Sequence, residues 1–277
     1  MFFGKGFLML PVDIILVRHG KSEGNKAGKA SRKGDNSLFT PEFRNRHSRT
    51  FRLTNTGISQ AKLAGEWLRN NIQMPLDRFY VSDYIRAKET AFYLDLPQAE
   101  WRVDFQLRER DMALMDNCPE DEKERLFELE RRQFEIDKFL SYPAGGGESI
   151  AALCLRLKTD WVAHLARECP DKRVIAVCHG HVMRGLQIIF EDLGHDDFIR
   201  LDSSTEPSDM MLNCQILWYT RRDPDSGKVE SSKLVAVRSI CNHGRIGDYG
   251  WRRIERKRYS NQELLDDVDK YPRHIYK

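Results

Sequence analysis

The sequence predicts an α/β fold, a three-layer α/β/α sandwich built on a mostly parallel central sheet. Residues 12–17 and 174–178 form apolar runs short enough to be buried strands, and each run ends near a His-Gly pair that precedes an apparently helical segment. Strands that alternate with helices are typical of a parallel sheet with helices on both faces. Ligands of such sheets bind in the crevice outside the carboxyl ends of the strands, where Arg18 and His19 would lie.

The remaining elements follow in chain order. Apolar residues recur at helical spacing in four segments, and the predicted helices cover residues 56–71, 83–94, 150–167 and 180–190. Short strands are predicted over residues 79–81 and 101–107. Two alternating runs, 212–220 and 233–241, flank a turn-forming Asp-Pro-Asp-Ser-Gly segment and indicate an antiparallel hairpin at the edge of the sheet.

The length and composition favour one large globular domain with an appendage. The chain has 277 residues, of which 40% are hydrophobic and 31% charged, and its net charge of +3 does not indicate a nucleic-acid-binding protein as a whole. We expect the domain to cover residues 1–241. A charged helical insertion is expected at about 112–147, and a basic C-terminal extension over 242–277 is expected to pack on the domain.

The basic extension leaves two interpretations open. Residues 251–259 form a basic run with Trp251 and Tyr259 at its ends, a pattern that can stack on bases and neutralise phosphates. We favour the alternative, a surface tail whose two aromatic rings pack back on the domain, because acidic residues follow at 266, 267 and 269.

Cysteine usage predicts a cytoplasmic protein. The six cysteines are scattered without a CxxC pair or zinc-site spacing, which indicates reduced thiols in an intracellular compartment and no metal centre. The apolar start of the chain is interrupted by Gly4, Lys5 and Gly6, and no small-residue cleavage site follows, so we expect no signal peptide. No stretch reaches the ~20 apolar residues of a membrane span, and we expect no membrane partner.

The Arg18-His19-Gly20 triplet suggests a pocket for an oxyanion. An arginine offers a fixed fork of donors for phosphate, and a histidine can act as a nucleophile or carry a proton. Taken alone, a histidine at the end of a strand is more often a structural residue. Residues 26–52 follow as a polar, basic segment, which is either a solvated surface loop or an electropositive rim that draws in an anionic substrate.

Further motifs make the chain resemble the histidine phosphatase, or phosphoglycerate mutase-like, superfamily. Its hallmarks are the Arg-His-Gly triplet at residues 18–20 and a second histidine, His179, at the end of a later strand. Other family elements agree in order between residues 12 and 218: Leu53-Thr54 with Gly57 and Gln60-Ala61, Ser82 with Arg86 and Thr90-Ala91, Leu107-Arg108-Glu109, and Gly146-Gly147-Glu148-Ser149. One departure follows Asp111, where the family pattern has a glycine and this chain has Met112-Ala113.

The resemblance implies a phosphoglycerate mutase-like fold and a reaction without metal or cofactor. His19 would be the nucleophile that forms a phosphohistidine, and Glu109 would be the general acid and base. Arg18, Arg86 and His179 would complete the catalytic set. The implied phosphate- or substrate-binding residues are Arg18, Ser22, Asn25, Arg86, His179 and Gly180. The helical insertion would cover this pocket.

We favour a phosphatase over a mutase. The insertion contains Arg131-Arg132 but lacks the proline-rich continuation found in the family's mutases, and the segment 142–149 resembles the broad-range phosphatases of the superfamily. A phosphoglycerate mutase-type phosphotransferase and a catalytically inactive module that binds a phosphorylated ligand remain alternatives. The expected partner is a phosphorylated small molecule or a phosphoprotein. The sequence predicts neither the particular substrate nor the oligomeric state.

Overall fold

Strand β1 (Asp13–Arg18) lies in the middle of a seven-stranded sheet. A computed structural model describes residues 9–72, 74–229, 231–241 and 247–275. Within these residues the strand order is β3-β2-β4-β1-β5-β6-β7. The first four strands of this order run parallel, with bounds β3 (Trp101–Asp104), β2 (Arg78–Ser82) and β4 (Arg173–Cys178) beside β1. The predicted mostly parallel core is confirmed.

The other half of the sheet is antiparallel. It consists of β5 (Ile216–Thr220), β6 (Ala236–Ile240) and β7 (Asp248–Arg253). The predicted hairpin exists as β5 and β6, but its position at the edge was wrong, because β7 pairs with β6 and forms the outer strand. Tyr249 and Trp251 alternate in β7 as in a strand, a signal that the neighbouring arginines obscured.

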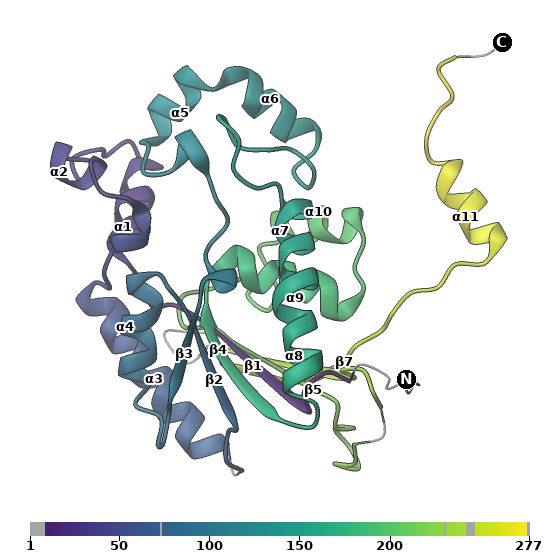
Figure 1. Ribbon diagram of the computed structural model, residues 1–277. Coiled ribbons are helices and arrows are strands. Elements are labelled where there is room, and N and C mark those ends of the chain that lie inside the picture. Colours follow the sequence, from purple (N-terminus) through teal and green to yellow (C-terminus); the bar gives the residue numbers. More distant parts are fainter. Residues whose placement is uncertain (1–8, 73, 230, 242–246, 276–277) are drawn as a thin grey trace, which may run out of the picture.

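Helices cover both faces of the sheet, as the predicted three-layer sandwich requires (Figure 1). One layer contains α3 (Asn55–Asn71) and α4 (Ile85–Leu94), which pack on Ile15 and Val17 of β1. The opposite layer contains α7 (Ile150–Arg156), a π-helical turn (Leu157–Val162), α8 (Ala163–Glu168) and α9 (Gly180–Glu191). It covers Ile14 and Leu16, since successive residues of a strand face opposite sides.

The segment after β1 is more helical than a loop. We expected a polar loop over residues 26–52, but α1 (Glu23–Ser31), α2 (Pro41–Arg44) and a 3₁₀ turn (Ser48–Thr50) occupy much of it. Within the insertion lie α5 (Glu120–Leu126) and α6 (Glu128–Ile136), and Figure 1 shows both beyond the carboxyl ends of the parallel strands. Arg44 on α2 pairs with Glu122 on α5 at 2.7 Å, which connects the two segments.

The two ends of the C-terminal extension differ. The Trp251 ring in β7 lies 5.3 Å from the Trp218 ring on β5, so this part packs on the sheet. Tyr259 is 49% exposed. Helix α11 (Asn261–Val268) buries none of its residues and lies apart from the other helices in Figure 1, and α10 (His195–Ser203) completes the fold after α9. The boundary at residue 241 stays a prediction. None of the described helices has the length and apolar character needed to cross a bilayer.

The start of β1 contains a buried ion pair that suggests a first test. Asp13 is 1% exposed, its Oδ2 lies 2.7 Å from Nε of Arg173, and its Oδ1 accepts a hydrogen bond from Trp218 at 3.0 Å. We expect Asp13→Ala to lower the free energy of unfolding by about 3–5 kcal/mol, because it leaves the Arg173 charge buried without its partner.

Urea denaturation of the variant measures this loss. Glu128→Ala is the matched control, since it breaks the exposed Arg132–Glu128 pair and should change the free energy of unfolding by less than about 0.5 kcal/mol. Equal losses in the two variants would contradict the assignment.

Candidate active site

A cavity of about 660 Å³ lies at the carboxyl ends of the parallel strands. It brings together six of the residues predicted from the sequence: Arg18, His19, Ser22, Asn25, Arg86 and Glu109. His179 and Gly180 do not line the cavity, but His179 is buried directly behind it, with its ring centroid 5.1 Å from that of His19. A larger cavity of about 810 Å³ lies at the start of β2 and contains none of these residues.

His19 is held as a neutral imidazole with a defined tautomer. Its Nδ1 lies 2.7 Å from the carbonyl oxygen of Gly20, and because a carbonyl can only accept, Nδ1 carries the hydrogen. Its Nε2 accepts a hydrogen bond from Nε of Arg86 at 3.0 Å. Burial, followed by the charges of Arg86, His179 and Arg18, lowers the pKa of His19 well below its ordinary value. The Nε2 lone pair therefore points toward Arg86, which also lines the cavity.

Two arginines, the buried Arg86 and the half-buried Arg18, supply positive charge beside this imidazole. Arg86, on the first turn of α4, donates from Nη1 to the Ser48 carbonyl at 2.8 Å and lies over the ring of Tyr84. Arg18 ends β1 and donates to the Met211 carbonyl. Burial lowers the pKa of both arginines, yet a guanidinium stays charged at any pH near neutrality. The two guanidinium groups thus make the site electropositive.

His179 ends β4 and precedes the first residue of α9. Its Nε2 lies 2.8 Å from the Ser82 hydroxyl oxygen at the end of β2, and burial lowers the pKa of the imidazole. Its Nδ1 and the Nε of Arg18 are buried without a hydrogen-bond partner among the described residues. A Cβ at Gly180 would lie 3.3 Å from that Nε, so the glycine lets the guanidinium lie close to the helix start.

Glu109 is a carboxylate in this site. Burial alone would raise its pKa, but the neighbouring His181 and a hydrogen bond from the Arg110 N–H outweigh burial, and the pKa of Glu109 lies well below its ordinary value. That N–H lies 3.0 Å from Oε1. A raised pKa would suit a general acid. The surroundings of Glu109 instead lower its pKa before a substrate binds.

Ser22 and Asn25 form the capping box of α1. The Ser22 hydroxyl accepts from the Asn25 N–H, and the Asn25 side-chain oxygen accepts from the Ser22 N–H, both at 3.2 Å. The Asn213 amide also donates to that oxygen at 3.1 Å. Both side chains line the cavity while they stabilise the helix start. Their predicted contact with phosphate stays a prediction.

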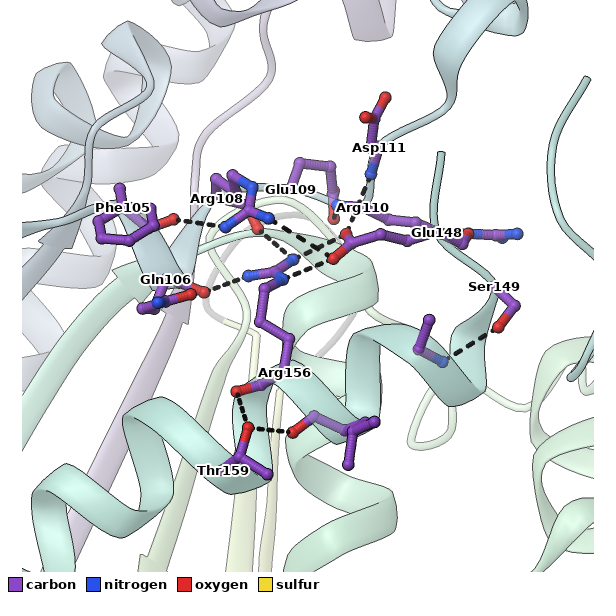
Figure 2. A network of polar contacts seen from close by, with 12 residues as sticks. Phe105, Gln106, Arg108, Glu109, Arg110, Asp111, Glu148, Ser149, Arg156 and Thr159 are labelled. Carbon is purple, nitrogen blue, oxygen red and sulfur yellow. Dashed lines mark hydrogen bonds and ion pairs between the residues drawn. The ribbon is translucent and has the colours of Figure 1, made fainter. Parts of the chain in front are cut away.

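The segment that carries Glu109 is fixed by a network that the sequence did not predict (Figure 2). Arg156 on α7 binds Glu148 through two parallel contacts, Nε to Oε1 at 2.6 Å and Nη2 to Oε2 at 2.9 Å. Arg156 also donates to the carbonyls of Gln106 and Arg108. The sequence singled out Glu148 as part of the Gly-Gly-Glu-Ser motif but assigned it no role. No local sequence pattern singled out Arg156.

Glu148 itself binds the chain on the other side of Glu109. Its Oε2 accepts from the Asp111 N–H at 3.2 Å, and its backbone carbonyl accepts from Arg110 Nε at 2.6 Å. Residues 106–111 are thus tied at both ends to one ion pair. Met112, at the position of the family's glycine, adopts φ −99°, and the left-handed conformation, φ 45°, falls on Ala113 instead.

The basic segment after β1 contributes part of the predicted rim. Arg46 pairs with Glu23 and Arg52 with Glu89, each at 2.7 Å, which neutralises these cations. The cationic side chains that do line the cavity, besides those described above, are Arg32, Arg49, Arg108, Arg110 and Lys123. The rim is therefore formed by residues of both the basic segment and the insertion.

Comparison with known proteins gives a family and several relatives. A family model described as "Histidine phosphatase superfamily (branch 1)" matches residues 14–208, which confirms the family resemblance. A 2,3-bisphosphoglycerate-dependent phosphoglycerate mutase of Parvibaculum lavamentivorans is 27% identical over 206 residues, 71% of this chain and 88% of the mutase.

Solved structures with the same fold include two bacterial proteins. Mycobacterial glucosyl-3-phosphoglycerate phosphatase is 23% identical, with a TM-score of 0.57 over 75% of this chain and 92% of the phosphatase. Bacillus stearothermophilus YhfR is 22% identical, with a TM-score of 0.58 over 78% of this chain and 93% of YhfR. At these identities the likeness shows the fold alone.

The neutral state of His19 predicts a pH dependence of stability. Below about pH 6.5 the imidazole takes up a proton in the unfolded chain but not in the folded one. The unfolded state then binds more protons, so the free energy of unfolding decreases as the pH falls. We expect His19→Asn to reduce this slope by up to about 1.4 kcal/mol per pH unit, measured by denaturation between about pH 7 and pH 5. An unchanged slope would contradict the neutral assignment.

The Glu148–Arg156 pair predicts a second stability effect. Glu148→Gln should lower the free energy of unfolding by about 2 kcal/mol, because charge-assisted hydrogen bonds to Arg156 are lost in a half-buried position. Amide hydrogen exchange at Asp111 should become faster in the same variant. Glu124→Gln, which alters an exposed pair with Arg131, is the control and should leave both measurements unchanged.

Proposed function

Because the chain belongs to the histidine phosphatase superfamily (branch 1), we propose that it is a metal-independent phosphomonoester hydrolase. In this proposal a phosphohistidine forms on His19. The observation that carries it is the tautomer of His19, whose Nδ1–H is bound to the Gly20 carbonyl and whose Nε2 has a lone pair, held by a hydrogen bond from Arg86 in the free site, that would attack phosphorus. A neutral imidazole is the nucleophilic form, and burial among cations keeps His19 in that form.

In the first step the bond between phosphorus and the leaving oxygen breaks as the bond to Nε2 forms. Arg86 would transfer its hydrogen bond from Nε2 to a phosphoryl oxygen, which exposes the lone pair as the substrate arrives. Arg18 Nε and His179 Nδ1, both buried without a partner among the described residues, would donate to the other oxygens. Donors placed in advance stabilise the charge of a loose transition state.

Glu109 would transfer protons in both steps. A dianionic phosphoryl group offsets the surrounding cations and so raises the pKa of Glu109, which lets the carboxyl protonate the leaving oxygen. In the second step the carboxylate takes a proton from water as the water attacks the phosphohistidine. The segment 106–111, held by Glu148 and Arg156, keeps this carboxyl beside the cavity.

A phosphoglycerate mutase is the second candidate, since curated relatives carry that name. A mutase must hold a second phosphate, and the family resemblance directed attention to Arg131 and Arg132 in the insertion. Arg131 pairs with Glu124 and Arg132 with Glu128, both on exposed surface of the insertion, and neither arginine lines the cavity. This arrangement favours hydrolysis over transfer.

The cavity suits a phosphorylated small molecule with further negative charge. Its volume of about 660 Å³ and Arg32 at its wall support this class, whereas the charges of Arg49 and Lys123 are offset by Asp83 and Glu120. The name of the similar mutase, which refers to phosphoglycerate, points the same way. A cytoplasmic location, inferred from the scattered cysteines, is part of the same proposal.

The test is release of inorganic phosphate from a panel of phosphomonoesters in the presence of EDTA. We expect release by the wild type and a loss of at least about 10³-fold in His19→Ala, because the nucleophile is removed. His195→Ala, which changes a histidine outside the cavity, should keep full activity. Substantial activity in His19→Ala would refute the nucleophile, and phosphoryl exchange between phosphoglycerates without release would make the protein a mutase.

A further inference from the structure

One histidine beside the cavity has no part in the mechanism above. His181 is the second residue of α9, and its Nδ1 lies 3.5 Å from Oε1 of Glu109. Both side chains line the cavity, but they differ in exposure: His181 is 46% exposed and Glu109 19%. His181 is therefore the more solvent-exposed of the two side chains.

The position of His181 does not serve the stability of α9. The N-terminal turn of a helix carries partial positive charge, and a cationic side chain there is unfavourable. Glu109 is the acidic side chain beside this histidine, and the two form an ion pair when the imidazole carries a proton.

The other titratable groups around the pair do not offer a proton at neutral pH. Arg18 and Arg86 face Glu109 from the end of β1 and the start of α4, and Arg110 follows it in the chain. All three are permanently charged. His179 and Cys178 face Glu109 from the end of β4, and Tyr84 from the residue before α4.

None of these three remaining groups, His179, Cys178 and Tyr84, is suited to exchange a proton with Glu109. Burial lowers the pKa of His179 and raises the pKa of Cys178, so both stay uncharged. Burial also raises the pKa of Tyr84 to about 12.

We propose that His181 is the proton relay of the site, a residue that exchanges protons between solvent and Glu109. The proposal rests on the proposed function and adds to it the route by which Glu109 gains and loses its proton. His181 acts through Glu109 and does not itself contact the phosphoryl group, so it is a positioning and relay residue.

The protons balance over the cycle. As the bond between phosphorus and the leaving oxygen breaks, protonated His181 passes its Nδ1 proton to the Glu109 carboxylate, and Glu109 passes one proton to the leaving oxygen. Glu109 is then a carboxylate again and His181 is neutral. When water attacks phosphohistidine, Glu109 takes one proton from the water and returns it to His181. His181 is then protonated again and His19 is free, so one ester and one water become one alcohol and one phosphate.

The experiment compares kcat/KM for two substrates in His181→Asn. An alkyl phosphate needs a proton on its leaving oxygen, whereas the leaving group of p-nitrophenyl phosphate departs without one. We expect kcat/KM for the alkyl phosphate to fall at least about tenfold near pH 7, with little change for p-nitrophenyl phosphate. Because this ratio reports only steps up to departure of the leaving group, hydrolysis of the phosphohistidine does not enter it.

Two further measurements separate a relay from a structural role. Added imidazole should restore much of the lost alkyl phosphatase activity in His181→Asn, and lowering the pH should restore activity relative to the wild type. His195→Asn is the matched control: His195 is the first residue of α10, is 45% exposed and pairs with Asp137 at 3.0 Å. It should behave as the wild type.

The outcomes are distinct. Equal losses of kcat/KM for both substrates, without rescue by imidazole, would overturn the relay and make His181 a substrate-binding or structural residue. Full activity of His181→Asn with both substrates would overturn it as well. A wild-type protein that releases no phosphate from either substrate would refute the proposed function, and the relay with it.

Discussion

The parallel pairing of β1 with β4 is the constraint on which the site depends. Arg18 lies opposite Cys178 in this register, so His19 and His179 leave adjacent strands at the same level. Because both faces of these strands are buried under helices, a shift by one residue would turn the apolar side chains to the wrong layer. The requirements of core packing therefore fix the distance between the two histidines.

The positive charge of this site has opposite effects on the charged forms of Glu109 and of the two histidines. Burial beside guanidinium groups disfavours the charged form of His19 and His179, so both are neutral. The positive surroundings favour the charged form of Glu109, so it is a carboxylate. A cation-rich pocket thus sets the protonation states of His19 and Glu109, the proposed nucleophile and proton carrier, together, and an arriving anion would change both environments at once.

The sequence predicted the layers, the parallel core and the residues of the cavity, because these depend on local apolar periodicity and on short motifs. It did not predict β7, where arginines hid a two-residue alternation, or the Glu148–Arg156 pair, which forms only when α7 packs beside the segment that follows β3. It also gave no sign that Ser22 and Asn25 cap a helix as well as line the cavity. Contacts between distant segments and double roles of one side chain leave no local pattern.

The hydrogen bond from Arg86 to Nε2 of His19 gives the free site a built-in protection. The same guanidinium that would hold the phosphoryl group masks the nucleophile until an anion competes for its donors. An uncharged electrophile does not compete for the hydrogen bonds of that guanidinium, so the Nε2 lone pair of His19 stays blocked. In the proposed reaction, selection by charge thus precedes selection by shape, and the proposed nucleophile His19 is shielded from uncharged alkylating and acylating agents.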